Sequence, residues 1–556
     1  MSQQDSLRSL LDDVQARSID RRSFIQRGIA LGLTPRAMAM VLGAAGVAVP
    51  VGLAAAAQTQ GGSFTEVLTQ DPQTLDPHLT SDGTAWNVFN EIFSPLMYQD
   101  IDFTYKGLLA ESWETSEDSL TITFTLREGV TFHDGSEFNA DSVKYTIDRL
   151  REVGTKSPIY DPVQTITVDV IDPKTVTFTF ETPDATFFNA FADGYAGMMN
   201  QSSVEAAGDE FGRKPVGSAA FMFKEWNTGN SVTLSAFDNF TTTEAYFDNK
   251  GRPYLDELGW KIIAEPFAQI ASLETGEIDA VDLSATDLPR FENDDRFEIF
   301  EARNTSLGYL GLTRTRPLME DVNVRTAIAH AIDRQEIVDT IFTGGLAEPV
   351  STPLPPSIPG YNAELEATTP AFDLDAAKKL LDDAGWVEGG DGIREKDGVM
   401  MQPQLYTTTS ATYGQAATLI QAQLRKIGVD VVINQIEQAA LQDFTPKGEH
   451  DMLMYSWGWS DPNVLYIFLS STRMESSNRV HYSNPDLDAL LVEGQQTLDW
   501  DARMEVYYKA QEIIIHDLPW VPLYMPITKT AVNKRIQGMK TFPTGRFLKN
   551  DAWVEE

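Results

Sequence analysis

From about residue 58 to its C-terminus, the chain alternates strand-like and helix-like patterns, and no low-complexity linker interrupts them. Alternation of this kind favours an α/β protein in which helices cover the faces of sheets. A single hydrophobic core rarely serves a chain of 556 residues, so the pattern predicts two or more domains.

The first part of this region has the pattern of a small α+β unit. Residues 119–126 alternate between apolar residues and threonine, which is typical of a half-buried strand. Residues 168–180 hold two such runs around an Asp-Pro pair, which predicts a β-hairpin. Between them, residues 139–150 have helical spacing and begin with residues that can cap a helix.

The later half favours an α/β lobe. We expect one continuous helix over residues 321–342, a second over 372–386 and a third over 417–428, followed by a strand at 429–436. This alternation predicts mostly parallel strand pairing. The proline-bounded apolar run at 519–526 could cross back to the first lobe, and two lobes joined by short crossings would leave a cleft for a ligand.

The composition limits the partners of the chain. Lys and Arg number 43 against 81 Asp and Glu, which gives a formal net charge of -38. Such a surface repels nucleic acid and anionic membranes, so no nucleic-acid partner is expected. The chain has no cysteine, which excludes disulfides, thiol nucleophiles and thiolate metal sites.

Residues 1–57 have the organisation of an export signal. A charged segment with Arg21-Arg22 precedes an apolar stretch and a small-residue run that ends at Ala57. The double arginine resembles a twin-arginine signal. Pro35 and Pro50 interrupt the apolar stretch, which argues against a membrane anchor. We therefore expect cleavage near Ala57 and a product that is free in the periplasm, without a lipid anchor because no cysteine is present.

No catalytic constellation is evident, so the sequence predicts a protein that is not an enzyme. His133-Asp134-Gly135 is best explained as a tight turn. No G-x-S-x-G elbow is present. The 6 histidines have no metal-ligand spacing, and we predict no catalytic residue, no metal site and no cofactor.

The stretch SWGWSDPN, residues 456–463, is the remaining candidate site. If it is extended, Trp457 and Trp459 point to the same face. Together with Tyr455, a glycine and several polar side chains, the two indoles could form a ligand-binding wall. They could equally be ordinary core residues, and periodicity alone leaves both interpretations open.

Several long motifs resemble the solute-binding proteins of peptide-type ABC importers, family 5. The first lie at 75–100 (LDPHLTSDGTAWNVFNEIFSPLMYQD) and 108–150, which contains LAESW and FHDG. Others follow in family order at 321–338, 372–386 and 424–433. The resemblance implies a two-lobed, type II, three-domain periplasmic binding fold. It also implies a protein, expected to be monomeric, that closes around a solute and delivers it to a membrane permease.

The resemblance also implies domain boundaries. After the signal segment 1–57, the main domain of lobe I would comprise 58–95, 216–310 and 526–556. Residues 96–215 would form an accessory α+β domain of lobe I, and residues 311–525 would form lobe II.

One departure from the family bears on the ligand. Peptide-binding members carry an Asp four residues before the Pro of a D/E-P pair, where it holds the peptide α-amino group. Here that position is Gly458, counted from Pro462. The ligand could be a peptide or a similar solute, and the alternatives are an oligosaccharide, an opine-like compound or another non-peptide solute. An exported hydrolase and a partner for a chemoreceptor are further hypotheses.

The expected ligand-binding residues are Tyr455, Trp457, Gly458, Trp459, Asp461 and Asn463, with Thr84, Trp86 and Asn87 from the first lobe.

Overall fold

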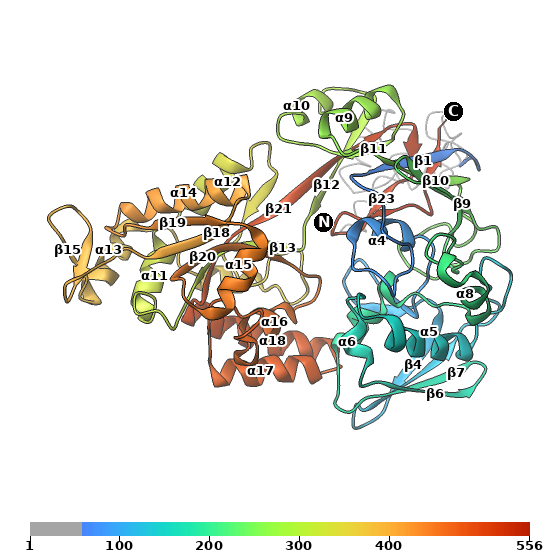
Figure 1. Cartoon of the computed structure of the whole chain (residues 1–556), viewed down its shortest axis with the longest axis horizontal. Helices are drawn as coiled ribbons and strands as arrows, with labels where there is room; N and C mark the ends of the chain where they lie inside the picture. The colour runs from blue at the N-terminus through green and yellow to red at the C-terminus, as the bar shows by residue number, and fades with distance from the viewer. Residues whose placement is uncertain (1–57, 556) are drawn as a thin grey trace, which may run out of the picture. The chain divides into compact units, whose positions relative to one another are not determined.

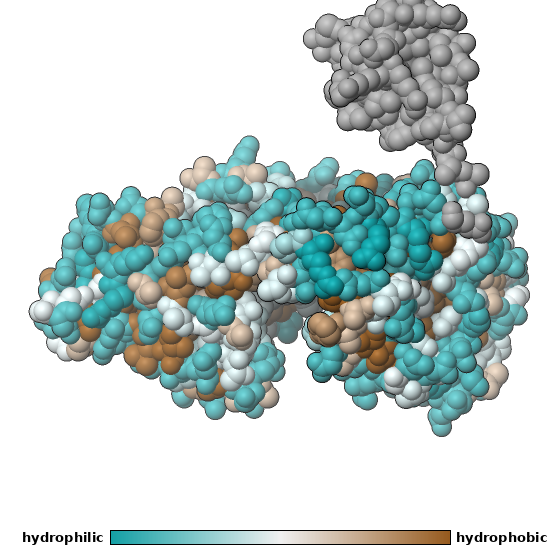
Figure 2. Space-filling model, turned by 90° about the horizontal axis from the view of Figure 1, so that it is seen from above, coloured by the Kyte–Doolittle hydropathy of each residue, from teal (hydrophilic) through white to brown (hydrophobic). Residues whose placement is uncertain are grey.

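The computed structural model describes residues 58–555. The chain divides into two units, Met1–Gly61 and Gly62–Glu556, and the description below concerns the second. The predicted signal segment, 1–57, lies outside the described residues. Within the described range, no helix is long and apolar enough to cross a membrane. Hydrophilic residues cover most of the face seen in Figure 2, in agreement with the strongly acidic composition.

The first sheet of lobe I has four strands in the order β1-β10-β9-β8 (Figure 1). β1 (Ser63–Leu68) is parallel to β10 (Glu257–Ile262), whereas β9 (Ser231–Ala236) pairs antiparallel with both β10 and β8 (Phe221–Asn227). Helix α4 (Gly83–Phe89) buries its apolar side chains in the same core as this sheet. That core contains Phe64, Val88, Phe89, Leu234 and Trp260.

A second four-stranded sheet confirms the predicted small α+β unit. β5 (Thr121–Leu126) lies between β4 (Ala110–Thr115) and β7 (Thr175–Thr179), and β7 forms a hairpin with β6 (Thr167–Asp172). Helix α5 (Ala140–Val153) packs on the sheet and begins with a capping box at its N-cap. Threonines alternate with apolar residues along β5 and β7, so the apolar side chains lie on one face of this sheet, as the pattern predicts.

The strands of lobe II belong to an eight-stranded sheet with the order β11-β21-β13-β20-β18-β19 along its main path, and this sheet continues into lobe I through β21. β18 (Gln404–Thr408) is parallel to β19 (Val432–Ile436) and to β20 (Met452–Gly458). β13 (Ser306–Leu312) is antiparallel to both β20 and β21 (Trp520–Asn533). The expectation of mostly parallel pairing is therefore wrong, because strands from distant parts of the chain supply antiparallel neighbours.

The long strand β21 links the two lobes. Its first residues pair with β13, and Val521 and Leu523 belong to the core of lobe II. Its later residues pair with β11 (Ala280–Asp282) and β12 (Phe297–Arg303), and Ala531 and Val532 belong to cores of lobe I. The 519–526 segment itself pairs on the lobe II side, and the residues of β21 that follow it make the crossing to lobe I. Figure 1 shows β21 running between these groups of strands.

Two helices replace the continuous helix expected over 321–342. α11 (Val322–His330) ends before Ala331, and α12 (Arg334–Ile341) starts anew. The break has a local cause, since the side chain of Asp333 accepts a hydrogen bond from the backbone N–H of Glu336 at 3.1 Å. The other two predicted helices are present as α13 (Leu374–Asp383) and α14 (Ala411–Arg425).

Three helices cover one face of the lobe II sheet. They are α16 (Val464–Leu469), α17 (Pro485–Gln496) and α18 (Trp500–Asp517). Together with β13, β20 and β21 they enclose a core in which large aromatic residues meet. Its aromatic members are Tyr309, Trp457, Tyr482, Tyr507 and Trp520.

The C-terminal segment returns to lobe I. β22 (Ile536–Gln537) pairs with β25 (Trp553–Val554), and β23 (Lys540–Thr541) pairs with β24 (Phe547–Leu548). Phe547 packs edge-on against Phe64 of β1, with ring centroids 5.9 Å apart. This return brings residues 544–550 beside α4 and so completes the wall of a cavity.

Candidate functional site

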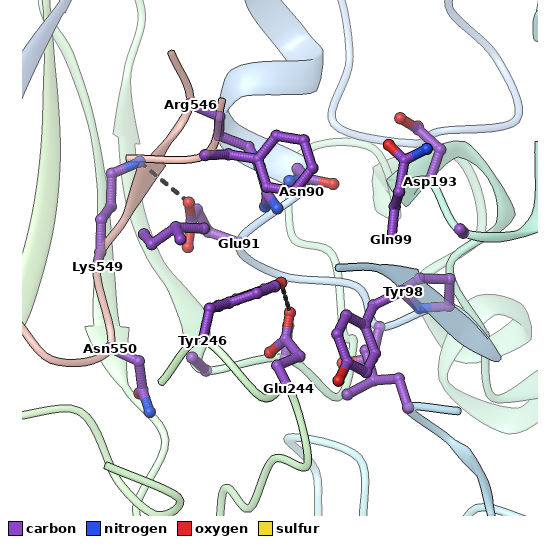
Figure 3. A pocket seen from close by; sticks show the side chains of 18 of the residues that line it. Asn90, Glu91, Tyr98, Gln99, Asp193, Glu244, Tyr246, Arg546, Lys549 and Asn550 are labelled. Atoms are coloured by element: carbon purple, nitrogen blue, oxygen red, sulfur yellow. Dashed lines mark hydrogen bonds and ion pairs between the residues drawn. The ribbon is translucent and has the colours of Figure 1, made fainter. Parts of the chain in front are cut away.

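A cavity of about 340 Å³ lies against α4 and the C-terminal segment (Figure 3). Lobe I supplies most of its lining, including residues 90–99 and 240–247. Thr305, just before β13, and Ser460, just after β20, complete it from the side of lobe II. A cavity that both lobes line is the usual position for a small-molecule site.

Lys549 is the centre of a buried ion-pair network in the wall. Its Nζ lies 2.9 Å from a carboxylate oxygen of Glu66 and 3.0 Å from one of Glu91. Burial raises the pKa of Glu66, although the ammonium of Lys549 opposes this effect. Two carboxylates thus share one ammonium, so Lys549 is fully occupied by protein partners.

Glu244 lies on another side of the cavity and has no cation within ion-pair distance among the described residues. It accepts hydrogen bonds from the hydroxyls of Thr242, at 2.7 Å, and Tyr246 (Figure 3). Burial raises its pKa above the usual range, and Arg546 only partly opposes this effect. The carboxylate is thus held in place by neutral donors.

Asp193 has similar surroundings. The indole Nε1 of Trp86 donates to its two carboxylate oxygens at 3.0 and 3.1 Å, and the backbone N–H of Tyr195 donates to one of them at 3.0 Å. Burial raises the pKa of Asp193, whereas these hydrogen bonds and Arg546 lower it. Trp86 is thereby fixed in the cavity wall by its hydrogen bonds to Asp193.

Aromatic rings form much of the remaining wall. Tyr98 and Tyr246 meet edge to face, with centroids 5.6 Å apart and an interplanar angle of 89°. The hydroxyl oxygen of Tyr98 accepts a hydrogen bond from the backbone N–H of Ala245 at 2.9 Å. Trp86 and Phe547 add further ring surface. Such a wall can contact an apolar or flat part of a ligand, or the charge of an organic cation.

A second cavity of about 320 Å³ adjoins the first. The two share Trp86, Glu91, Arg546 and Lys549 in their walls. The second also includes Asp282, whose pKa is raised by burial and whose carboxylate accepts a hydrogen bond from Thr530 at 2.6 Å. A ligand could therefore extend along lobe I past a series of acidic side chains.

The structure brings together part of the predicted first-lobe set. Trp86 lines both cavities and Asn87 lines the second. Thr84 lines neither, and its half-buried side chain lies in the first turn of α4, after the N-cap Asp82. Trp86 and Asn87 therefore line cavities of lobe I, and their role in ligand binding stays a prediction.

The two indoles of SWGWSDPN do not form one open wall. β20 ends at Gly458, between them. Trp457 is only 3% exposed and packs against Phe468 and Trp520, at centroid distances of 6.5 and 6.4 Å. Trp459 is 41% exposed, and its backbone N–H donates to the carbonyl of Thr305 at 3.0 Å. The expectation of a shared open face is wrong, because the regular strand ends before the second indole.

Asp461 and Asn463 are also turned away from solvent. Asp461 is 1% exposed, and Arg503 donates to its two carboxylate oxygens at 2.7 and 2.8 Å. The backbone N–H of Asn463 donates to the same carboxylate at 2.8 Å. In this structure Asp461 is a structural residue and not an open cleft residue, since its carboxylate is paired with the guanidinium of Arg503. Asn463 is buried at the N-cap of α16, whereas Ser460, which is not among the predicted residues, lines the cavity.

Tyr455 and Gly458 complete the predicted set. The guanidinium of Arg479 lies 4.9 Å from the centroid of the Tyr455 ring, and Gln438 contacts its hydroxyl. Gly458 is exposed at the end of β20. Because β18, β19 and β20 are parallel, their carboxyl ends meet at one edge of the sheet, which is the usual ligand-binding edge. Gly458 and Trp459 lie at this edge.

Several cavity residues escaped the sequence analysis. Glu91 lies inside the motif at 75–100, so the resemblance could have directed attention to it. The others come from loops and from the C-terminal return, where no spacing pattern marks them. They are Asp193, Glu244, Tyr246, Arg546 and Lys549.

His133 has the structural role that the sequence favours. One ring nitrogen is 3.0 Å from the carbonyl oxygen of Ala219, and the other accepts from the backbone N–H of Gly217 at 3.2 Å. Burial lowers its pKa to about 4. Within residues 58–555, no group of three His, Asp or Glu side chains is arranged to hold a metal ion.

Known proteins share this architecture over most of its length. The chain is 29% identical over 508 residues to the oligopeptide-binding protein AppA of Bacillus subtilis (strain 168), a match that covers 89% of this chain and 92% of that protein. It is 28% identical over 493 residues to the glutathione-binding protein GsiB of Salmonella typhimurium, covering 86% and 92% of the two chains. The structure of HbpA2 from Haemophilus parasuis superposes with a TM-score of 0.79 at 25% identity, covering 89% of this chain and all 100% of that one.

The family model of the bacterial extracellular solute-binding proteins, family 5 Middle, matches residues 104–476, which is more than half of the chain. The resemblance inferred from the sequence motifs and the two-lobed fold are both confirmed. The chain therefore belongs to the bacterial extracellular solute-binding proteins of family 5.

Proposed function

We propose that this chain is the solute-binding component of an ABC importer, and that it captures a peptide or a similar small organic solute in the cavity beside α4. The observation that carries the proposal is the cavity itself. Aromatic side chains and a few fixed polar groups from lobe I meet Thr305 and Ser460 from the opposite side. This mixture is characteristic of sites that bind small organic molecules.

Lobe closure would complete the site. β21 and the segment that joins β12 to β13 link the lobes. Two connections of this kind can act as a hinge. Contacts between the lobes already exist near the cavity, since the hydroxyl of Ser460 donates to the side-chain oxygen of Asn189 at 3.3 Å. A bound solute that contacts both walls would favour the closed state by its differential affinity.

The same proposal includes the setting in which the protein works. We expect residues 1–57 to direct export by the twin-arginine route and the remainder to act as a monomer, free in the periplasm. It would deliver its solute unchanged to a membrane permease. The relatives named as oligopeptide- and glutathione-binding proteins support a peptide-like solute.

Native mass spectrometry combined with small-angle X-ray scattering tests this proposal. The purified protein is mixed with a defined set of di- to pentapeptides, glutathione and neutral oligosaccharides. We expect one class to bind at a ratio of one per chain, to reduce the radius of gyration and to be recovered chemically unchanged. Conversion of a bound compound into a product would contradict a pure binding function. Binding of oligosaccharides alone would contradict a peptide-like solute.

A further inference from the structure

The charges around the two cavities do not balance. Five carboxylates line them, and only two cations accompany these carboxylates. The acids are Glu66, Glu91, Asp193, Glu244 and Asp282, and the cations are Arg546 and Lys549. Charges in a poorly solvated site are costly unless they are paired, so this excess of negative charge favours a positively charged occupant.

The two cations do not neutralise the whole wall. Lys549 is taken up by Glu66 and Glu91, at 2.9 and 3.0 Å. Arg546 makes no ion pair within 4.0 Å among the described residues, and its Cζ lies 5.9 Å from the centroid of the Phe542 ring. Asp193 and Glu244 therefore keep neutral hydrogen-bond donors as their direct partners.

A buried amide oxygen in the cavity wall also favours a ligand that donates a hydrogen bond. Asn550 is 2% exposed and lines the first cavity, and its Oδ1 is buried without a hydrogen-bond partner. The orientation of this amide is fixed, because its Nδ2 donates to the carbonyl oxygen of Asn249 at 2.5 Å. A buried acceptor without a donor is costly, and a ligand N–H group could satisfy it.

The opposite wall offers no carboxylate for the same purpose. Asp461 is held by Arg503 from both of its oxygens. Gly458 stands at the position where the sequence motif would place an acidic residue, and it has no side chain. The acidic groups that remain open to a ligand are therefore on lobe I.

We propose that the solute carries a positively charged nitrogen and that Asp193 or Glu244 binds this group inside lobe I. The proposal rests on the proposed function, since it assigns a ligand class to the same cavity. Aromatic rings beside the carboxylates, those of Trp86, Tyr98 and Tyr246, would contact the cation and the carbon atoms next to it. The substrate class is thus an organic cation or a solute with a basic side chain.

Three small probes of matched shape separate charge from shape. Phenethylamine is cationic at neutral pH, 2-phenylethanol is neutral and phenylacetate is anionic. Their dissociation constants are measured by ligand-observed NMR on the whole protein at low salt. We expect phenethylamine to bind about tenfold more tightly than 2-phenylethanol, as expected for a charge-assisted hydrogen bond, and phenylacetate to bind most weakly.

A double variant, Asp193→Asn with Glu244→Gln, should remove this preference, so that phenethylamine and 2-phenylethanol bind with similar affinity. The matched control is Glu117→Gln with Asp118→Asn. It removes the same number of charges from an exposed turn between β4 and β5, away from the cavity. The control should bind all three probes as the unmodified protein does.

The outcomes distinguish this inference from the proposed function. If the probes bind with no preference for the amine, or if phenylacetate binds most tightly at Arg546, the cavity binds solutes but the assignment of a cation is wrong. The assignment is also wrong if the double variant keeps the preference. If none of the three probes binds, both the cation assignment and the cavity as the solute site are wrong.

Discussion

Asp461 in lobe II and Asp193 in lobe I are both carboxylates, and their surroundings differ. Asp461 is 1% exposed and shares two charge-assisted hydrogen bonds with Arg503. Asp193 has an indole N–H and a backbone N–H as its donors, and no cation within ion-pair distance among the described residues. The first carboxylate is satisfied by the protein, whereas the second has capacity left for a ligand.

The same contrast holds for the two indoles beside Asp461. Trp457 lies in the core that β20 shares with α16 and β21, whereas Trp459 is largely open to solvent. Residue type alone therefore does not mark a ligand-binding residue. What distinguishes the two cases is whether the rest of the fold already occupies the polar or aromatic surface.

The largest effect should follow from breaking the buried ion pair. Asp461→Ala leaves the guanidinium of Arg503 buried without its partner, which should lower the free energy of unfolding by about 3–5 kcal/mol. Urea denaturation measures this loss. Replacing both residues, Asp461→Leu with Arg503→Met, should recover much of it. The exposed pair Lys379–Asp383 is the control, since Asp383→Ala should cost less than about 0.5 kcal/mol.

Removing the buried indole should be nearly as destabilising. Trp457→Ala deletes a large side chain from the lobe II core, and we expect a loss of about 3–5 kcal/mol in the free energy of unfolding. Thermal and urea unfolding both report it. A loss below about 1 kcal/mol, together with much weaker solute binding, would instead show that Trp457 is a ligand-binding residue.

Removing the exposed indole should affect binding instead of stability. Trp459→Ala should weaken solute binding by about 1–3 kcal/mol, the scale for burying a large side chain, if lobe closure covers this ring. Calorimetry with the solute identified by native mass spectrometry measures the change. Unchanged affinity would show that Trp459 does not contact the solute.

The smallest effect has the opposite sign. Asp193→Asn with Glu244→Gln should stabilise the solute-free protein at pH 7, on the order of 1 kcal/mol, because a costly pair of buried charges is removed from a binding site. In the folded protein burial raises the pKa of both carboxyls, so their protonated forms favour the folded state.

The pH dependence of that gain follows from linkage. The destabilisation by these two groups is absent below the pKa of the unfolded carboxyls and develops as the pH rises through the raised folded pKa. Urea unfolding at several pH values should therefore show the advantage of the double variant disappearing as the pH falls toward 4. A variant that is less stable than the unmodified protein at pH 7 would contradict unpaired charges at these positions.

The sequence predicts much of the fold and only part of the site. Local alternation correctly predicts β5, the β6–β7 hairpin and α5. β5 pairs with the neighbouring β4, and β6 pairs with the neighbouring β7, so local sequence is enough to indicate these strands. It does not predict strand direction in lobe II, where β21 joins from a distant part of the sequence. Asp333 caps a new helix instead of continuing the preceding one, and the periodicity of apolar residues does not distinguish these two possibilities.

The site shows the same limit more strongly. The family motif includes Trp86 and Glu91, so the wall contributed by α4 could be anticipated. Lys549 contacts Glu91 across 458 positions of the chain, and Arg503 reaches Asp461 across 42. Neither contact produces a local sequence pattern. The folded structure is therefore needed to show whether a carboxylate is paired within the protein or is available to a ligand.

A structure of the protein with its co-purified solute tests the central claim most directly. We expect a solute in the cavity beside α4, against Trp86 and Tyr246, with a positively charged nitrogen within hydrogen-bond distance of Asp193 or Glu244. A solute held elsewhere, or one that places an anionic or uncharged group against these two carboxylates, would contradict it.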